Sequence, residues 1–122
     1  MGSGYRDSSK KFIGFRYAFK GIVYAIKHER NMKIHLLATF IVLIVSIYTQ
    51  ITPIEWAVLL LTCALVLSLE IMNTAIEVAL NYIEPSKQEA IGIAKDLAAG
   101  AVFIAAIFSI TIACFIFIPY WI

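Results

Sequence analysis

The sequence predicts an all-helical (all-α) integral membrane protein, in which one amphipathic helix at the membrane surface is followed by three membrane-spanning helices. Hydrophobic residues make up 61% of the 122 residues, charged residues only 15%, and the mean hydropathy is +0.87. A water-soluble domain of this length could not hide that much apolar surface. The length allows about three spans of roughly 20 residues each. The composition therefore excludes a soluble enzyme, a disordered chain and a small secreted domain held by disulfides.

The N-terminal part divides into a flexible polar segment at residues 1–11 and a surface helix at residues 12–30. Apolar side chains recur at three- and four-residue steps along that helix, namely Phe12, Phe15, Phe19, Ile22, Val23 and Ile26. This spacing places one apolar stripe on a helix, and the lysines and arginines lie mostly off it. The pattern is typical of a helix that lies on a membrane, with its cations toward anionic headgroups.

Three apolar runs predict the membrane spans, at residues 34–50, 54–80 and 97–118. Trp56, Tyr120 and Trp121 fit an aromatic belt at one membrane interface. Together with the surface helix, the spans are expected to form a single membrane domain over residues 12–122. Three thin helices bury little apolar surface within one subunit, and so we expect a homo-oligomer.

Positive charge predicts the orientation of the chain in the membrane. All ten lysines and arginines fall before the first span or between the second and third spans. The positive-inside rule places that side, with the N-terminus and the 81–96 loop, in the cytoplasm, and it places the C-terminus outside. Headgroups of the inner leaflet explain the basic stretch, and so we expect no binding of nucleic acid.

The second span is the most informative, because Glu70, Asn73 and Glu77 share one face of the predicted helix. At 3.6 residues per turn, the two carboxylates point within about 20° of each other, and the carboxamide lies about 60° to the side. A carboxylate in a span costs on the order of 2–3 kcal/mol, which makes it a functional-site candidate. Counting about 20 residues inward from Trp56 places Glu70 just inside the cytoplasmic boundary.

Further ionisable residues are expected at the same level of the membrane. Glu29 ends the surface helix, and Lys95 and Asp96 open the third span. Packing of the helices would bring these residues close to Glu70 and Glu77, within one subunit or across subunits. Carboxylate and amide oxygens suit a Mg²⁺ ion shared with nucleotide phosphates, a lysine can neutralise phosphate charge, and a carboxylate can accept a hydroxyl proton. The residues thus predict an acidic, magnesium-compatible site at the cytoplasmic surface.

Two other classes of protein remain open on these residues, a small oligomeric ion channel and a non-catalytic membrane assembly factor. A channel needs polar residues along the whole span, and the outer half of the second span is apolar. The glycines are scattered and form no phosphate-binding loop. His28 and His35 are interpreted as interfacial polar residues, because the carboxylates already provide a base.

Four motifs resemble those of the small prokaryotic diacylglycerol kinase family, in the family's order, and the resemblance covers residues 12–118. They are Glu29-Arg30-Asn31-Met32-Lys33-Ile34-His35, Ile54-Glu55-Trp56, Glu70-Ile71-Met72-Asn73-Thr74-Ala75-Ile76-Glu77 and Ala94-Lys95-Asp96-Leu97-Ala98-Ala99-Gly100-Ala101-Val102. The resemblance implies a homotrimer in a bacterial cell membrane, with active sites shared between neighbouring subunits. It also implies transfer of the ATP γ-phosphoryl group to a lipid alcohol. The context of His35 resembles the Gram-positive undecaprenol kinase branch, so undecaprenol is the expected acceptor and diacylglycerol the alternative.

The same resemblance implies roles for individual residues. Glu70 resembles the general base and, with Asn73, a contact of the lipid hydroxyl, whereas Glu29 and Glu77 resemble the Mg²⁺ ligands. The residues that resemble ATP contacts are Tyr17, Lys20, Glu29, Asn73, Glu77, Lys95 and Asp96. Many relatives have Asp at the position of Asn81, so a charge role there does not transfer to this sequence.

Overall fold

The computed structural model describes residues 11–83 and 89–122, with side chains from residue 14 onward. Within these residues it forms four helices, α2 (Lys11–His28), α3 (Arg30–Thr49), α4 (Pro53–Ile83) and α5 (Glu89–Trp121). The predicted flexible segment lies outside the described residues, except for Lys11, which begins α2. The all-helical fold predicted from the sequence is confirmed.

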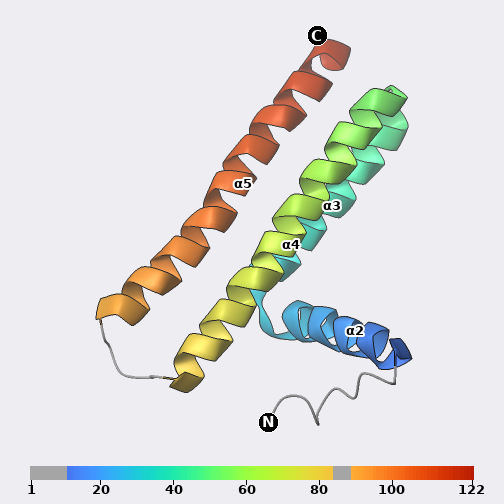
Figure 1. Cartoon of the computed structure of the whole chain (residues 1–122). Helices are drawn as coiled ribbons and strands as arrows, with labels where there is room; N and C mark the ends of the chain where they lie inside the picture. The colour runs from blue at the N-terminus through green and yellow to red at the C-terminus, as the bar shows by residue number, and fades with distance from the viewer. Residues whose placement is uncertain (1–10, 84–88) are drawn as a thin grey trace.

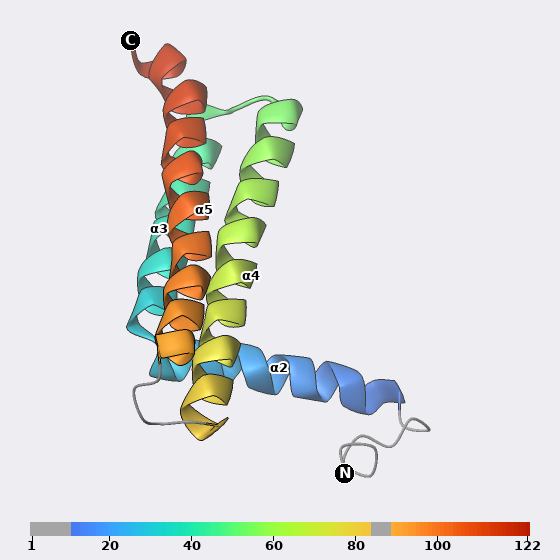
Figure 2. The same ribbon diagram turned by 60° about the vertical axis from the view of Figure 1, so that its left-hand side comes forward.

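The three long helices α3, α4 and α5 run side by side, and α2 lies across the end of the bundle that is far from the C-terminus (Figures 1 and 2). Each of the three is long and apolar enough to cross a membrane. The helix α2 is shorter and contacts both α3 and α4. This arrangement agrees with the predicted surface helix and three spans.

The chain turns between α2 and α3 at Glu29, whose backbone is extended, with φ −113° and ψ 118°. Two side chains near this turn are almost fully buried, Ala25 at the end of α2 and Met32 at the start of α3. The small Ala25 lies with Gly21 and Tyr24 beside the stretch of α4 between Ile71 and Ala79. The turn therefore fixes α2 against the same part of α4 that contains the predicted acidic residues.

The helices extend beyond the apolar runs that predicted them. The helix α4 continues to Ile83 rather than ending at residue 80, and α5 begins at Glu89 rather than at residue 97. A helix satisfies its own backbone hydrogen bonds, so it can continue from the apolar span into the polar interface. Lys95 and Asp96 consequently lie inside α5 and not at its start.

Aromatic residues of α5 connect the three spans at the other end of the bundle. The Tyr120 hydroxyl donates to Glu55 Oε1 at 2.5 Å, and Trp121 Nε1 donates to Thr49 Oγ1 at 3.3 Å. Glu55 also closes a capping box at the start of α4, where the Thr52 amide donates to Glu55 Oε1 and the Glu55 amide donates to Thr52 Oγ1. These contacts fix the relative positions of the span ends.

Few apolar side chains are buried within the chain itself. The buried cluster consists of Ile51, Leu59 and Ile116, whereas many large apolar side chains of the spans are more than half exposed. In a membrane, such faces contact lipid or other subunits. The bundle therefore has room on its surface for further protein contacts.

Candidate active site

The centre of the candidate site is Glu70 on α4. Its side chain is 1% exposed, and neither carboxylate oxygen has a hydrogen-bond partner among the described residues. A buried polar group without a partner costs free energy, and a buried charge costs more. A carboxylate kept in such a place is the strongest sign of function in the described part of the chain.

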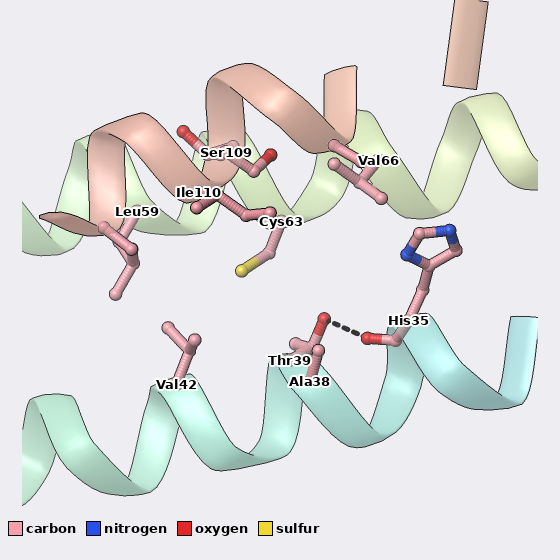
Figure 3. A pocket seen from close by; sticks show the side chains of 12 residues that line it. His35, Ala38, Thr39, Val42, Leu59, Cys63, Val66, Ser109 and Ile110 are labelled. Carbon is pink, nitrogen blue, oxygen red and sulfur yellow. Dashed lines mark hydrogen bonds between the residues drawn. The ribbon is translucent and has the colours of Figure 1, made fainter. Parts of the chain in front are cut away.

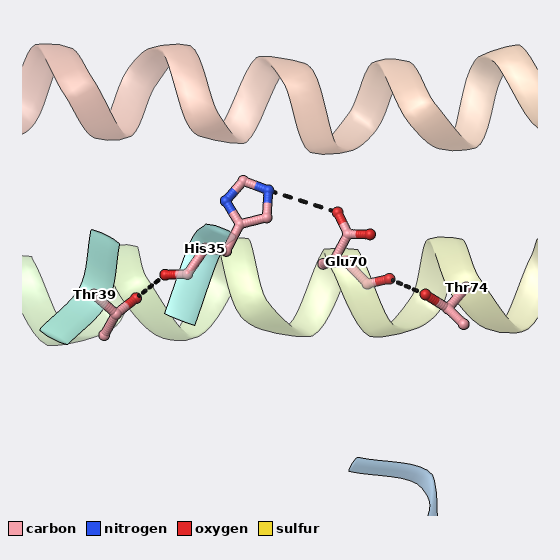
Figure 4. Close-up of polar contacts among 4 residues, drawn as sticks. All are labelled: His35, Thr39, Glu70 and Thr74. Carbon is pink, nitrogen blue, oxygen red and sulfur yellow. Dashed lines mark hydrogen bonds and ion pairs between the residues drawn. The ribbon is translucent and has the colours of Figure 1, made fainter. Parts of the chain in front are cut away.

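His35 on α3 faces this carboxylate from the neighbouring helix (Figure 4). His35 Nε2 lies 3.6 Å from Glu70 Oε1, an ion-pair distance that is longer than a hydrogen bond. The sequence interpretation treated His35 as an interfacial polar residue and did not place it beside Glu70. The position of His35 within the first two turns of α3 indicated the same membrane level as the acidic residues. Which residue of α4 it faces, however, depends on how α3 and α4 are rotated about their axes.

Two polar residues continue the site one turn further along α4. Asn73 is buried, and its carboxamide oxygen has no hydrogen-bond partner in the described part of the chain. The Thr74 hydroxyl, in contrast, donates to the backbone carbonyl of Glu70 at 3.1 Å and so is satisfied within its own helix (Figure 4). Asn73 therefore offers an available oxygen beside Glu70, whereas the Thr74 hydroxyl is already engaged.

The other two predicted carboxylates lie around Glu70. Glu29 lies in the turn between α2 and α3, and Glu77 lies two turns after Glu70 on α4; both are partly buried. Their negative charges oppose the charge of the Glu70 carboxylate, whereas a protonated His35 and the side chain of Asn73 favour it. Across residues 11–83 and 89–122, no three carboxylate, histidine or cysteine side chains converge closely enough to hold a metal ion by themselves. A cation there would need ligands from outside this set, such as phosphate oxygens and water.

The structure ties Lys95 to a residue that the site prediction did not include. Lys95 Nζ on α5 donates to Asn81 Oδ1 on α4 at 2.6 Å. Asn81 is the position at which the sequence departs from the family pattern, and here it holds the ammonium group of Lys95. The next residue, Asp96, is exposed.

The two predicted ATP contacts of α2 lie next to each other. The ammonium group of Lys20 lies 5.6 Å from the centre of the Tyr17 ring, within the range of a cation–π contact. Both residues precede the part of α2 that packs beside α4. The structure thus places them on the helix that covers the same end of the bundle as Glu29.

An apolar cavity of about 230 Å³ lies between the three spans, and His35 is one of its lining residues (Figure 3). Its hydroxyl groups are bonded to their own helices: Thr39 donates to the His35 carbonyl, Thr62 to the Val58 carbonyl and Ser109 to the Ala105 carbonyl. Because these hydroxyls are satisfied, the cavity presents mainly hydrocarbon. His35 therefore contacts both the apolar cavity and the Glu70 carboxylate.

The fold and the site together define a class of protein: a helical membrane protein in which one histidine, His35, lies between an apolar cavity and a buried carboxylate with further acidic residues around it. The model of the prokaryotic diacylglycerol kinase family matches residues 16–117. The chain belongs to this family and is a membrane lipid kinase, a phosphotransferase that uses ATP.

Individual relatives differ in the lipid that their names specify. A diacylglycerol kinase of Synechocystis is 38% identical over 88% of this chain, and the chain spans only 62% of that protein's length. An undecaprenol kinase of Bacillus subtilis is 37% identical over 93% of this chain and 92% of its own length. A diacylglycerol kinase of Escherichia coli K12 is 29% identical over 80% of both chains. The nearly equal identities of the first two leave the acceptor lipid open.

Proposed function

We propose that the chain phosphorylates undecaprenol with ATP at the cytoplasmic face of a bacterial cell membrane, giving undecaprenyl phosphate. The observation that best supports this proposal is the buried carboxylate of Glu70, which accepts no hydrogen bond among the described residues and faces His35, a lining residue of an apolar cavity. In a lipid alcohol, a short part of the hydrocarbon chain suits the apolar cavity, and the hydroxyl group suits the carboxylate. The proposal explains why a carboxylate is kept at a position that is 1% exposed and where it accepts no hydrogen bond among the described residues.

Glu70 acts as the general base in this proposal. Its carboxylate accepts the proton of the lipid hydroxyl while the hydroxyl oxygen forms a bond to the γ-phosphorus of ATP. The bond between that phosphorus and the bridging oxygen breaks, and ADP leaves with the electron pair. Glu70 then releases the proton to water. Asn73, buried one turn from Glu70, is the second residue proposed to contact the lipid hydroxyl, through its amide nitrogen, which can donate to the hydroxyl oxygen.

The acidic residues around Glu70 form the nucleotide side of the site. Glu29 and Glu77 would hold a Mg²⁺ ion together with phosphate oxygens and water, since one or two carboxylates suffice for this ion. Two observations support this fit, the like charges around Glu70 and the unpartnered oxygen of Asn73. The ion, when bound, neutralises charge on the transferring phosphoryl group. The proposed ATP contacts are Tyr17, Lys20, Glu29, Asn73, Glu77, Lys95 and Asp96.

The working unit is proposed to be a homotrimer formed by the single membrane domain at residues 12–122. Exposed apolar faces on all three spans leave room for subunit contacts, and Lys95 and Asp96 would complete the site of a neighbouring subunit. The proposed orientation has the N-terminus and the acidic site in the cytoplasm and the C-terminus outside, and the distribution of lysine and arginine supports it. A channel would instead need free polar groups along the spans, whereas the hydroxyls that line the cavity are bonded to their own helices.

The acceptor is tested by comparing undecaprenol and diacylglycerol with the purified full chain in detergent micelles. We expect ATP consumption that depends on Mg²⁺ and on lipid, with kcat/KM about tenfold or more in favour of undecaprenol, the discrimination a shaped apolar site can supply. The Bacillus subtilis relative, similar over nearly the full length of both chains, supports this preference. A higher kcat/KM with diacylglycerol would show that diacylglycerol, and not undecaprenol, is the preferred acceptor. The absence of turnover with any lipid alcohol would contradict the kinase proposal.

The contact between Lys95 and Asn81 leads to a prediction about ATP binding. Replacing Asn81 with alanine should raise KM for ATP by about 2- to 10-fold, the equivalent of one hydrogen bond, because the Lys95 ammonium loses its fixed acceptor. Lys95→Met should raise it further, and Tyr82→Phe, at the adjacent and 89% exposed position, should leave KM unchanged. Steady-state kinetics at saturating lipid measure all three. An unchanged KM in Asn81→Ala alongside a raised KM in Lys95→Met would show that the contact does not position the lysine.

A further inference from the structure

We propose that His35 is a positioning residue, which orients the Glu70 carboxylate so that one of its oxygens faces the lipid hydroxyl. The inference rests on the proposed function, because it assigns His35 a role through the base. The geometry that suggests it is a contact between two spans: His35 on α3 and Glu70 on α4 face each other at 3.6 Å (Figure 4).

The first step of the argument concerns the freedom of Glu70. A glutamate side chain has three rotatable bonds, and neither oxygen of this carboxylate is held by a hydrogen bond among the described residues. Glu29 and Glu77 repel its charge, whereas a protonated His35 and the side chain of Asn73 favour it. Because Asn73 lies on the same helix as Glu70, His35 is the contact from the neighbouring span α3 that selects one orientation of the carboxylate.

The second step concerns the two carboxylate oxygens. His35 Nε2 points to Oε1, which leaves Oε2 as the oxygen that can accept the proton of the lipid hydroxyl. The present distance exceeds that of a hydrogen bond, and catalytic contacts are often long before substrate binds and tighten in the complex. A donor on Oε1 thus fixes the position of Oε2.

The third step concerns the place of His35 relative to the lipid. The side chain lines the apolar cavity as well as contacting Glu70, and it is 20% exposed (Figure 3). A hydrocarbon chain in the cavity would approach Glu70 past the imidazole ring. His35 therefore lies where it can align the base with an acceptor that arrives from the membrane.

Three substitutions at this position separate a positioning role from a packing role. Gln places its side-chain amide nitrogen near the position of the histidine Nε2, whereas Asn is too short and Leu has no donor. We expect His35→Leu and His35→Asn to lower kcat by about 10- to 100-fold, as for a small misplacement of a reacting group, with KM for ATP within about twofold of wild type. His35→Gln should retain most of kcat. Because Gln and Asn are both polar, the comparison holds even where the Leu variant folds poorly.

A double-mutant cycle with Glu70→Gln gives the decisive measurement. If His35 acts through Glu70, His35→Asn should cause no further loss of kcat in the Glu70→Gln background. A full additional loss in that background, or unchanged kcat in both His35→Asn and His35→Leu, would overturn the inference while leaving the kinase proposal intact. Failure of the proposed function would give a different result: the wild-type protein itself would show no lipid-dependent turnover.

Discussion

Glu70→Gln is expected to lower kcat for lipid phosphorylation by about 10²- to 10⁴-fold, the usual contribution of a positioned general base. Glutamine has the same shape as glutamate but accepts no proton at neutral pH. KM for ATP should change little, because the base contacts the lipid hydroxyl and not the nucleotide. Measurement of kcat with saturating ATP and undecaprenol gives the result directly.

The same substitution should leave the fold at least as stable as in the wild type. Glu70 is 1% exposed, and its oxygens accept no hydrogen bond among the described residues, so a neutral amide removes the cost of burying a charge and loses only the long contact with His35. Thermal unfolding in micelles should therefore occur at an equal or higher temperature, although activity is lost. Glu89→Gln, the same change at an exposed position at the start of α5, is the matched control and should keep full kcat. Full turnover in the Glu70→Gln variant would remove Glu70 as the base.

Removal of either predicted Mg²⁺ ligand is expected to have the second largest effect. Glu29→Gln and Glu77→Gln should each lower kcat/KM for ATP by about 10²- to 10³-fold, similar to the loss of one preorganised electrostatic contact at a transition state. A neutral amide binds a hard divalent cation more weakly than a carboxylate does, so the Mg²⁺ concentration needed for half-maximal activity should rise in both variants. Titration with Mg²⁺ at fixed ATP measures this change.

Chelation gives the matching experiment on the unmodified protein. A chelator in excess should abolish turnover, and added Mg²⁺ should restore it, because the proposed site would share the ion with the nucleotide phosphates. Glu89→Gln again provides the control, with an unchanged Mg²⁺ requirement. A requirement that stays the same in both Glu29→Gln and Glu77→Gln would contradict their assignment as ligands.

Several features of the site follow from local sequence alone. Glu70, Asn73 and Glu77 fall on one side of a helix because a regular helix repeats every 3.6 residues, and α4 places them in the group around Glu70 as this spacing predicts. Glu29 is the extended residue between α2 and α3, and there its charge acts on Glu70. The membrane class likewise depends only on the length and hydrophobicity of each run.

Other features required the packed structure. The spacing of residues along α4 did not show that His35 faces Glu70, nor that Asn81 holds Lys95. The length of an apolar run also did not show that α5 begins at Glu89, several residues before the predicted span. The first two contacts depend on how neighbouring helices pack against each other. The start of α5 depends on polar residues that continue the helix beyond its apolar part.

The sequence by itself determined a three-span membrane protein with a surface helix, its family, and an acidic face on the second span. These depend on composition, periodicity and motifs, which are properties of one segment at a time. Only the tertiary structure decided which side chains meet across helices, including His35 with Glu70 and Lys95 with Asn81. The reason is that the rotation and offset of each span are set by packing against its neighbours, and no single span encodes them.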